Sequence, residues 1–309
     1  MRKNFINAYD RLQKKHRRLK ISFVCTVVFC VILLFGIIYI NYDYILFKNL
    51  IAHTYSHTEA LDELFQTHLG FAPANYARYF DNLVISIVTA EIRRTANDIY
   101  TYQYSPNQRI AQREGVIARA QLSRIEEISP DTVYMHLTNS SPYVRNFVRA
   151  NIDTLASFDN LILDLRGNLG GYLNAIEYIA SLFLQPRDTI GYNTTRINLL
   201  SQQRSASRGQ PLSFDNIIIL QNGQTASAAE ILILALKENL DNVTTVGSQT
   251  FGKGVGQVTL PLRRGFAVRA TTILFESPLG NIIHNIGIAP DIEFFGDDII
   301  DFAIDIIGA

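Results

Sequence analysis

The stretch LILDLRGNLGGYLNAIEYIASLFL, residues 161–184, contains a short apolar run, a glycine-rich turn and a helical pattern in direct succession. The apolar run, residues 161–165, has the length of a buried strand rather than that of a helix. A second succession of this kind occupies residues 217–240, where IIIL leads through QNGQT into another helical pattern. Strands that alternate with helices predict an α/β layer architecture with a mostly parallel central sheet.

Weaker patterns predict the secondary structure of the rest of the chain. Residues 42 to about 104 place apolar residues at spacings of three and four, which predicts a helical region. Residues 105–108 (SPNQ) are interpreted as a turn, 143–158 as one helix and 193–213 as a loop or small hairpin. The segment VIARAQLSRIEEI (116–128) fits either a strand or a helix. Further strands are predicted in four segments: 132–138, 243–247, 257–262 and 266–275.

An uncharged apolar run, residues 21–40, lies near the N-terminus. As a helix it would span roughly 30 Å, the thickness of the hydrocarbon core of a bilayer. KKHRRLK (14–20) precedes it, so the positive-inside rule places the N-terminus in the cytoplasm and the remainder of the chain outside. A cleaved signal peptide is the competing interpretation. The length of the run, and the lack of an A-x-A-like site after it, favour an uncleaved anchor over residues 21–41.

Charge and cysteine content restrict what the rest of the chain can do. The first 20 residues carry eight Lys or Arg and one acid, so the remainder of this neutral chain has a net charge of −7. It has no basic patch with interleaved aromatic residues, which argues against a nucleic-acid partner. Both cysteines, Cys25 and Cys30, lie inside the apolar run. The external part is therefore expected to have no disulfide and no thiol chemistry.

Ser227 opens the helical pattern that follows the strand at residues 217–220 and its turn. A hydroxyl at this position meets unpaired backbone N–H groups and the positive end of a helix, where a developing negative charge is stabilised. The pattern Ser227-x-x-Glu230 is also a capping box, and its ordinary use is to begin a helix. Local sequence alone leaves the capping role open beside a catalytic one.

Lys253 stands between two glycines in TFGKG, which lets its backbone approach other groups closely. In an extended chain Lys253, Val255 and Gln257 point to one side, so that Gln257 could hold the amine by a hydrogen bond. A lysine acts as a base only after losing its proton. Burial, here beside apolar residues such as Phe251, can lower a lysine pKa from about 10.4 to roughly 7. A lysine in a surface loop is the alternative.

The glycines of RGNLGG (166–171) can free successive backbone N–H groups to face an oxyanion. Ordinary turns use the same residues, and the spacing differs from that of nucleotide-binding loops. The histidines show no metal-ligand spacing, and no metal is expected. They are scattered along the chain: His16, His53, His57, His68, His136 and His284.

Together these segments resemble the S41 peptidases, the family of carboxy-terminal processing or tail-specific proteases. Residues 161–184 resemble the family's DLRGNPGG segment and the helix after it, with Leu169 in place of the usual proline. NGQTASAAEIL resembles the nucleophile segment, and TVGSQTFGKGVGQ resembles the lysine segment. The resemblance covers residues 125–305 and extends to two weaker matches: NDIYTYQYSPNQ (97–108) and GIAPDIEF (287–294).

The resemblance implies a ClpP/crotonase-like α/β core at residues 125–309, preceded by a basic cytoplasmic segment at 1–20, the anchor, and an extracytoplasmic helical region at 42–124. It also implies a serine peptidase without metal or organic cofactor that acts on peptides or protein tails. Ser227 takes the position of the nucleophile, Lys253 that of the general base and Gln257 that of its orienting partner. The oxyanion hole would use the backbone N–H groups of Ala228 and of either Gly170 or Gly171.

One feature departs from the family. Most members carry a peptide-binding PDZ domain after the SPEE-like turn, but only 20–25 residues separate SPNQ from the strand at 132–138. In this respect the chain resembles nisin-resistance proteins, which are anchored S41 relatives without that domain. Those relatives use a histidine base from the segment in which this sequence has Tyr100 and Thr101, whereas this chain keeps Lys253.

Three other interpretations stay open. The chain could be a resistance protease that cleaves cationic antimicrobial peptides, to which its acidic external part is complementary in charge. It could be a non-catalytic peptide-binding scaffold, although retention of Ser, Lys and Gln together argues against this. It could be a crotonase-like acyl-CoA enzyme, which the expected external location disfavours.

Overall fold

The computed structural model describes residues 2–54, 56–196, 202–209 and 212–308. By its internal contacts the chain divides into two compact units, Met1–Ile87 and Val88–Ala309. The first unit is helical, as predicted for residues 42–104. It contains α1 (Arg2–Ile40), α2 (Tyr42–Thr54), α3 (Thr58–Leu69) and the start of α4 (Tyr76–Ala96).

Lys14–Ile40 of α1 is the one helical segment, among the residues described, that is long and apolar enough to cross a membrane. Its most apolar window has a mean hydropathy of 3.0, and its side chains are exposed. In a soluble protein an apolar face of this size would be buried by other elements. A helix of this composition near an N-terminus fits a membrane anchor or a signal sequence.

The three shorter helices of the first unit pack through aromatic and charged contacts. The rings of Phe47 and Phe80 meet edge to face with centroids 5.9 Å apart. Beside them Asp81 accepts hydrogen bonds from the Tyr44 hydroxyl at 2.6 Å and from the Lys48 ammonium at 2.7 Å. Because Lys48 is largely shielded from water, this ion pair holds α2 on α4 more firmly than an exposed pair would.

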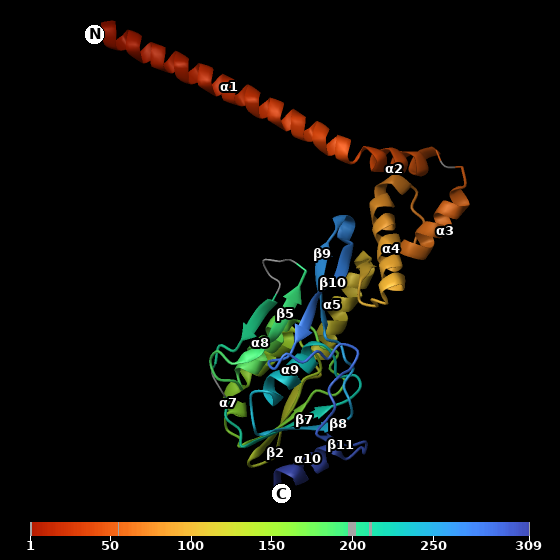
Figure 1. Cartoon of the computed structure of the whole chain (residues 1–309), viewed down its shortest axis with the longest axis vertical. Helices are drawn as coiled ribbons and strands as arrows, with labels where there is room; N and C mark the ends of the chain where they lie inside the picture. Colours follow the sequence, from red (N-terminus) through yellow and green to blue (C-terminus); the bar gives the residue numbers. More distant parts are fainter. Residues whose placement is uncertain (1, 55, 197–201, 210–211, 309) are drawn as a thin grey trace. The chain divides into compact units, whose positions relative to one another are not determined.

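The second unit contains two sheets and the helices that cover them (Figure 1). The six-stranded sheet has the order β11-β8-β7-β4-β3-β2, parallel except for the edge strand β2. Its strands are β2 (Arg124–Ser129), β3 (Thr132–His136), β4 (Asn160–Asp164), β7 (Asn216–Gln221), β8 (Val243–Gly247) and β11 (Ile292–Glu293). The predicted parallel centre of an α/β fold is confirmed.

The second sheet is antiparallel throughout its described part, and β10 is its centre. β10 pairs with β1, β5 and β9, and β5 pairs with β6. The strands are β1 (Tyr102–Tyr104), β5 (Thr189–Thr195), β6 (Gln202–Ala206), β9 (Val255–Pro261) and β10 (Ala267–Glu276). β5 and β6 form a hairpin, one of the two alternatives predicted for 193–213, but β5 begins earlier, at Thr189. The connection at 197–201 lies outside the described residues.

Helices cover both faces of the parallel sheet, because its buried strands are apolar on both sides. One core cluster joins β3, β4 and β7 to α6 (Pro142–Ala150), α8 (Leu173–Ser181) and α9 (Ala228–Lys237). The opposite face packs against α10 (Ile299–Gly308), a helix that the sequence patterns did not predict. Residues alternate between the two clusters along each strand: Leu161 and Leu163 face α8 and α9, whereas Ile162 faces α10.

Three local predictions are wrong. SPNQ is not a free turn: Ser105 caps α5 (Pro106–Ala120), its N–H donating to Gln108 Oε1 at 2.8 Å and its Oγ accepting from the Gln108 N–H at 3.3 Å. The single helix expected at 143–158 is two, because α6 ends at Ala150 and α7 (Ile152–Leu155) begins after Asn151. β1 also ends the predicted helical region early, and by pairing with β10 it belongs to the second unit.

Candidate active site

The turn after β4 is braced by buried charge. Asp164, almost fully buried at the end of the strand, accepts from Arg166 Nη2 at 2.6 Å and from the Tyr134 hydroxyl at 2.7 Å. The carboxylate favours the charged guanidinium and holds the pKa of Arg166 above its ordinary value. A buried carboxylate paired in this way fixes the direction in which the glycine-rich turn leaves the sheet.

Gly170 lies directly against the segment that carries Ser227. A Cβ atom at Gly170 would come within 2.6 Å of the Ala226 carbonyl oxygen and 2.8 Å of Ser227 Cβ. The φ angle of Gly170 is +85°, in the left-handed region that side chains rarely adopt. Only glycine fits both the close approach and the backbone angle, so the turn after β4 and the serine segment form one site.

The structure corrects the predicted role of Gly170 as an oxyanion donor. Its N–H donates to Asn168 Oδ1 at 2.9 Å, and it is therefore already occupied. Asn168 is fully buried, donates from Nδ2 to the Leu137 carbonyl at 2.8 Å, and accepts at its own carbonyl from the Ala226 N–H at 2.9 Å. Gly170 and Asn168 shape the turn and attach it to the serine segment.

The backbone N–H groups of Gly171 and Ala228 have no hydrogen-bond partner among the described residues of this site. Ala228 is the first residue of α9, where the helix cannot satisfy its own N–H groups. Gly171 is held beside Ser140, whose carbonyl oxygen a Cβ at Gly171 would approach to 2.4 Å. Both groups belong to the pair of segments that meet at Gly170 and Ser227.

Ser227 has a φ of +57° and a ψ of −120°, an angle pair that is strained for a residue with a side chain. Strained backbone of this kind persists only where the surroundings impose it, and it is concentrated at functional sites. The Ser227 N–H donates to Glu230 Oε2 at 2.7 Å, which is one half of the predicted capping box. The glutamate therefore stabilises the strained turn at the start of α9.

Glu230 does more than cap the helix. Fully buried, it also accepts from the N–H of Lys253 at 2.8 Å, from the N–H of Gly252 at 2.7 Å and from the Thr250 hydroxyl at 2.5 Å. Its Oε2 atom binds the N–H groups of both Ser227 and Lys253. The two backbone nitrogens thus share one acceptor atom, and the predicted serine and lysine segments are brought together.

The side chain of Lys253 is half-buried and lies over the ring of Tyr100, with Nζ 4.6 Å from the ring centroid. Its pKa is lowered from 10.5 to about 8, chiefly because burial disfavours the charged ammonium. The positive charge of Arg269 acts in the same direction, and the carboxylate of Glu230 opposes it. Phe251, expected to shield the amine, is itself half-exposed, and Tyr100 covers the amine instead.

The predicted hydrogen bond between Gln257 and Lys253 is absent from the described hydrogen bonds of the site. Gln257 Nε2 donates to the Val255 carbonyl at 3.2 Å, and Oε1 accepts from Arg269 Nη2 at 2.9 Å. The reason is that Lys253 lies before β9, which begins only at Val255. The alternation assumed for an extended strand does not reach the lysine.

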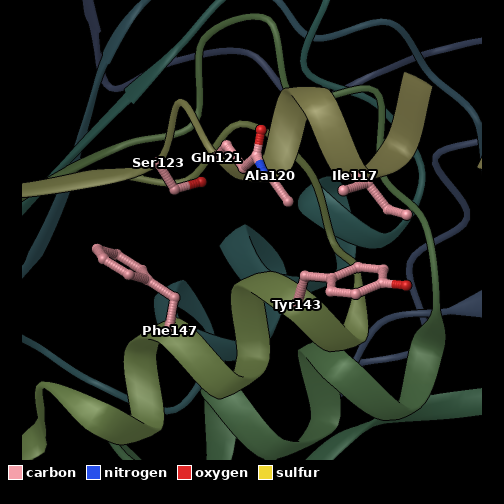
Figure 2. Close-up of a pocket in the computed structure, with 6 residues that line it drawn as sticks. All are labelled: Ile117, Ala120, Gln121, Ser123, Tyr143 and Phe147. Atoms are coloured by element: carbon pink, nitrogen blue, oxygen red, sulfur yellow. The ribbon is translucent and has the colours of Figure 1, made fainter. Parts of the chain in front are cut away.

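A separate pocket of about 330 Å³ opens between α5 and α6 (Figure 2). Six residues line it: Ile117, Ala120, Gln121, Ser123, Tyr143 and Phe147. None of them is a predicted site residue. Among the described residues, no group of three or more His, Cys, Asp or Glu is placed to hold a metal ion.

Known proteins resemble the part of the chain that contains the candidate active site. It is 40% identical over 145 residues to the carboxyl-terminal-processing protease of Synechocystis sp.. The aligned stretch covers 47% of this chain and 33% of that protein. It is 34% identical over 164 residues to the chloroplastic carboxyl-terminal-processing peptidase 3 of Arabidopsis thaliana, covering 52% and 31%. The matches thus span about a third of the length of these relatives.

Solved structures share the fold over a greater length. A lipoprotein from Streptococcus agalactiae superposes with a TM-score of 0.58 at 21% sequence identity, covering 74% of this chain and 82% of that protein. The model of peptidase family S41 matches residues 131–294, just over half of the chain, and includes Gly170, Ser227 and Lys253. The chain therefore belongs to peptidase family S41.

Proposed function

We propose that the chain is a serine peptidase in which Ser227 is the nucleophile and Lys253 is its general base. The observation that carries the proposal is the shared acceptor: Glu230 Oε2 binds the backbone N–H groups of both residues. Beside them lie two unpaired N–H groups, and the half-buried lysine has a lowered pKa. A nucleophile, a base and oxyanion donors are the parts that acyl transfer requires.

In this mechanism Lys253 Nζ takes the proton from Ser227 Oγ as the oxygen attacks the carbonyl carbon of a peptide bond. The N–H groups of Ala228 and Gly171 stabilise the tetrahedral oxyanion. The intermediate collapses to an acyl-enzyme, and the departing amine takes the proton from the lysine ammonium. Water then attacks the ester while Lys253 accepts its proton. The lysine ammonium returns a proton to Ser227 Oγ as the ester bond breaks, and the carboxylic acid leaves.

The pH dependence of the reaction should follow Lys253. The base works as a neutral amine, and its pKa of about 8 lies well below the ordinary 10.5. Under conditions where chemistry limits the rate, kcat/KM should rise about tenfold per pH unit below pH 8 and level off above it. Initial rates on a neutral peptide across pH 5.5–10 measure this. A profile that is flat across that range would contradict a lysine base.

We propose that the protein is anchored in the cell membrane by residues 21–41, with the peptidase part outside the cytoplasm. The apolar segment of α1 and the basic stretch before it support this placement. A protease added to intact cells should then remove a C-terminal epitope tag, while a cytoplasmic marker survives. Protection of the tag until the cells are lysed would show that the orientation is wrong.

Substrates are proposed to be unstructured protein tails or short peptides, including cationic ones. α5 ends at Ala120 and β2 begins at Arg124, so no peptide-binding domain is inserted between these two elements. Selection would then depend on residues flanking the scissile bond. The full chain in detergent should cleave a peptide and its C-terminally amidated form at rates within about twofold, while Ser227→Ala cleaves neither. A strong requirement for the free carboxylate would instead reveal a site that reads the tail.

A further inference from the structure

The helix α2 has an apolar side that faces away from the helix it packs on. Its inner side meets α4, where Phe47 stacks on an aromatic ring and Lys48 forms its ion pair. Four large apolar side chains lie on the opposite side, and each is 41–57% exposed: Tyr42, Ile45, Leu46 and Leu50. Residues three, four and eight positions apart share one side of a helix. We call these four residues the outer face of α2.

The outer face begins where the apolar segment of α1 ends. Asn41 is the residue between Ile40, the last of α1, and Tyr42, the first of α2. Because consecutive Cα atoms lie about 3.8 Å apart, Tyr42 is within about 8 Å of the end of that segment. The connection has no slack, since the Asn41 N–H donates to the Ile37 carbonyl at 3.2 Å and the Ile45 N–H donates to the Asn41 carbonyl at 2.9 Å. If α1 spans a bilayer, α2 therefore starts in the headgroup layer.

The residues around this connection suit the boundary between lipid and water. Tyrosine is enriched at that boundary, because its ring is apolar while its hydroxyl stays in water. Tyr39, near the end of α1, and Tyr42 are both exposed. Asn49 and His53 continue the same side of α2 with polar groups. A helix of this kind can lie in the interfacial layer with its apolar side buried by about 5–10 Å.

We propose that α2 is a second membrane contact, whose outer face lies in the lipid of the interfacial layer beside the point where the anchor leaves the bilayer. This rests on the anchor proposed above for residues 21–41. A single span fixes only one point of attachment. With the outer face in lipid, α4, which packs on α2 through Phe80, is also held at the membrane surface.

The test uses single tryptophans, because the chain has none of its own. The full chain is reconstituted into phosphatidylcholine vesicles whose lipid carries bromine, a quencher, either just below the headgroup or near the end of the acyl chain. Leu46→Trp should have blue-shifted emission and lose most of it to the shallow bromine. Ile32→Trp, within the anchor, should be quenched most by the deep bromine. Leu64→Trp, the control at another exposed leucine of the same unit, should emit as in water and resist both.

A charge substitution provides a second readout. When Ile45→Glu and Leu50→Glu are added to Leu46→Trp, the emission should shift to the red and most of the quenching should disappear, because carboxylates are driven out of lipid. These side chains are exposed, so the fold should be retained, and circular dichroism checks this. Unchanged quenching with both glutamates present would contradict a contact through the outer face.

The outcomes separate this proposal from the others. Leu46→Trp that emits as in water while Ile32→Trp is quenched overturns the contact and leaves the anchor standing. Blue-shifted emission that neither bromine quenches means that protein, such as a second copy of the chain, covers the outer face, and the proposal is wrong. Equal quenching at Leu46→Trp and Leu64→Trp would mean lipid binding without a defined face, which also overturns it. If Ile32→Trp is not quenched, both the anchor and the contact are refuted, whereas peptide cleavage enters none of these measurements.

Discussion

Ser227→Ala and Lys253→Ala should each abolish peptide hydrolysis, lowering kcat/KM by about 10³-fold or more. The serine supplies the oxygen that forms the acyl-enzyme, and without the lysine no neutral amine is left to take its proton. The double variant should be little worse than either single one, because the two residues act as one unit. Steady-state kinetics on a fluorogenic peptide measure all three.

Lys237→Ala is the matched control for the lysine substitution. Lys237 is in α9, close in sequence to Ser227, but it pairs with Asp291 at 2.6 Å on the partly exposed side of the helix. Loss of such a pair costs about 0–1 kcal/mol and should leave kcat/KM unchanged. Substantial turnover by Lys253→Ala at neutral pH would contradict the lysine base and return attention to a histidine.

Glu230→Ala should give the largest loss of stability. The buried carboxylate accepts from three backbone N–H groups and one hydroxyl, and alanine leaves these donors without a partner. Each unsatisfied buried donor costs about 1–3 kcal/mol, so the free energy of unfolding should fall by roughly 3 kcal/mol or more. Urea denaturation at pH 7 measures the change.

Activity should disappear with this substitution even where the protein remains folded, because Glu230 holds the serine and lysine segments against each other. Glu230→Gln is expected to fail as well, since one of the two acceptor oxygens is replaced by an amide NH2 group, which donates and cannot accept from the N–H groups that face it. Glu238→Ala is the matched control: this half-exposed residue near the end of the same helix binds Leu279 N–H and Asn281, and its loss should cost under about 1 kcal/mol. Full activity of Glu230→Ala would show that the shared acceptor is not required.

The sequence predicts four strands of the six-stranded sheet, β3, β4, β7 and β8, but it leaves β2 open between strand and helix and does not predict β11. β4 is buried along its whole length and β7 nearly so. The two strands run parallel, and the turns that follow them therefore lie at one edge of the sheet. The break between α6 and α7 at Asn151 and the helix after SPNQ are less visible. At these two places the local sequence pattern is compatible with a turn or with a helix, and capping hydrogen bonds and packing determine which of them forms.

The sequence predicts which segments form the candidate site, but it does not predict the hydrogen bonds that join these segments. Ser227-x-x-Glu230 predicts a cap, whereas the bonds from Glu230 to Gly252 and Lys253 join residues more than twenty positions apart. Tyr100 and Lys253 are in contact although they lie still farther apart along the chain, and no local sequence pattern predicts this contact. The N–H of Gly170 is occupied because Asn168 folds back onto it, a detail of one turn that glycine spacing does not reveal.

The most direct test of the mechanism is to trap the acyl-enzyme. The full chain is mixed with an activated peptide ester, quenched with acid during turnover, digested and mapped by mass spectrometry. The mechanism predicts one acyl group on Ser227 that is absent from the Ser227→Ala variant and strongly reduced in Lys253→Ala. An acyl group on another residue, or ester hydrolysis that persists in Ser227→Ala, would contradict the assignment of Ser227 as nucleophile.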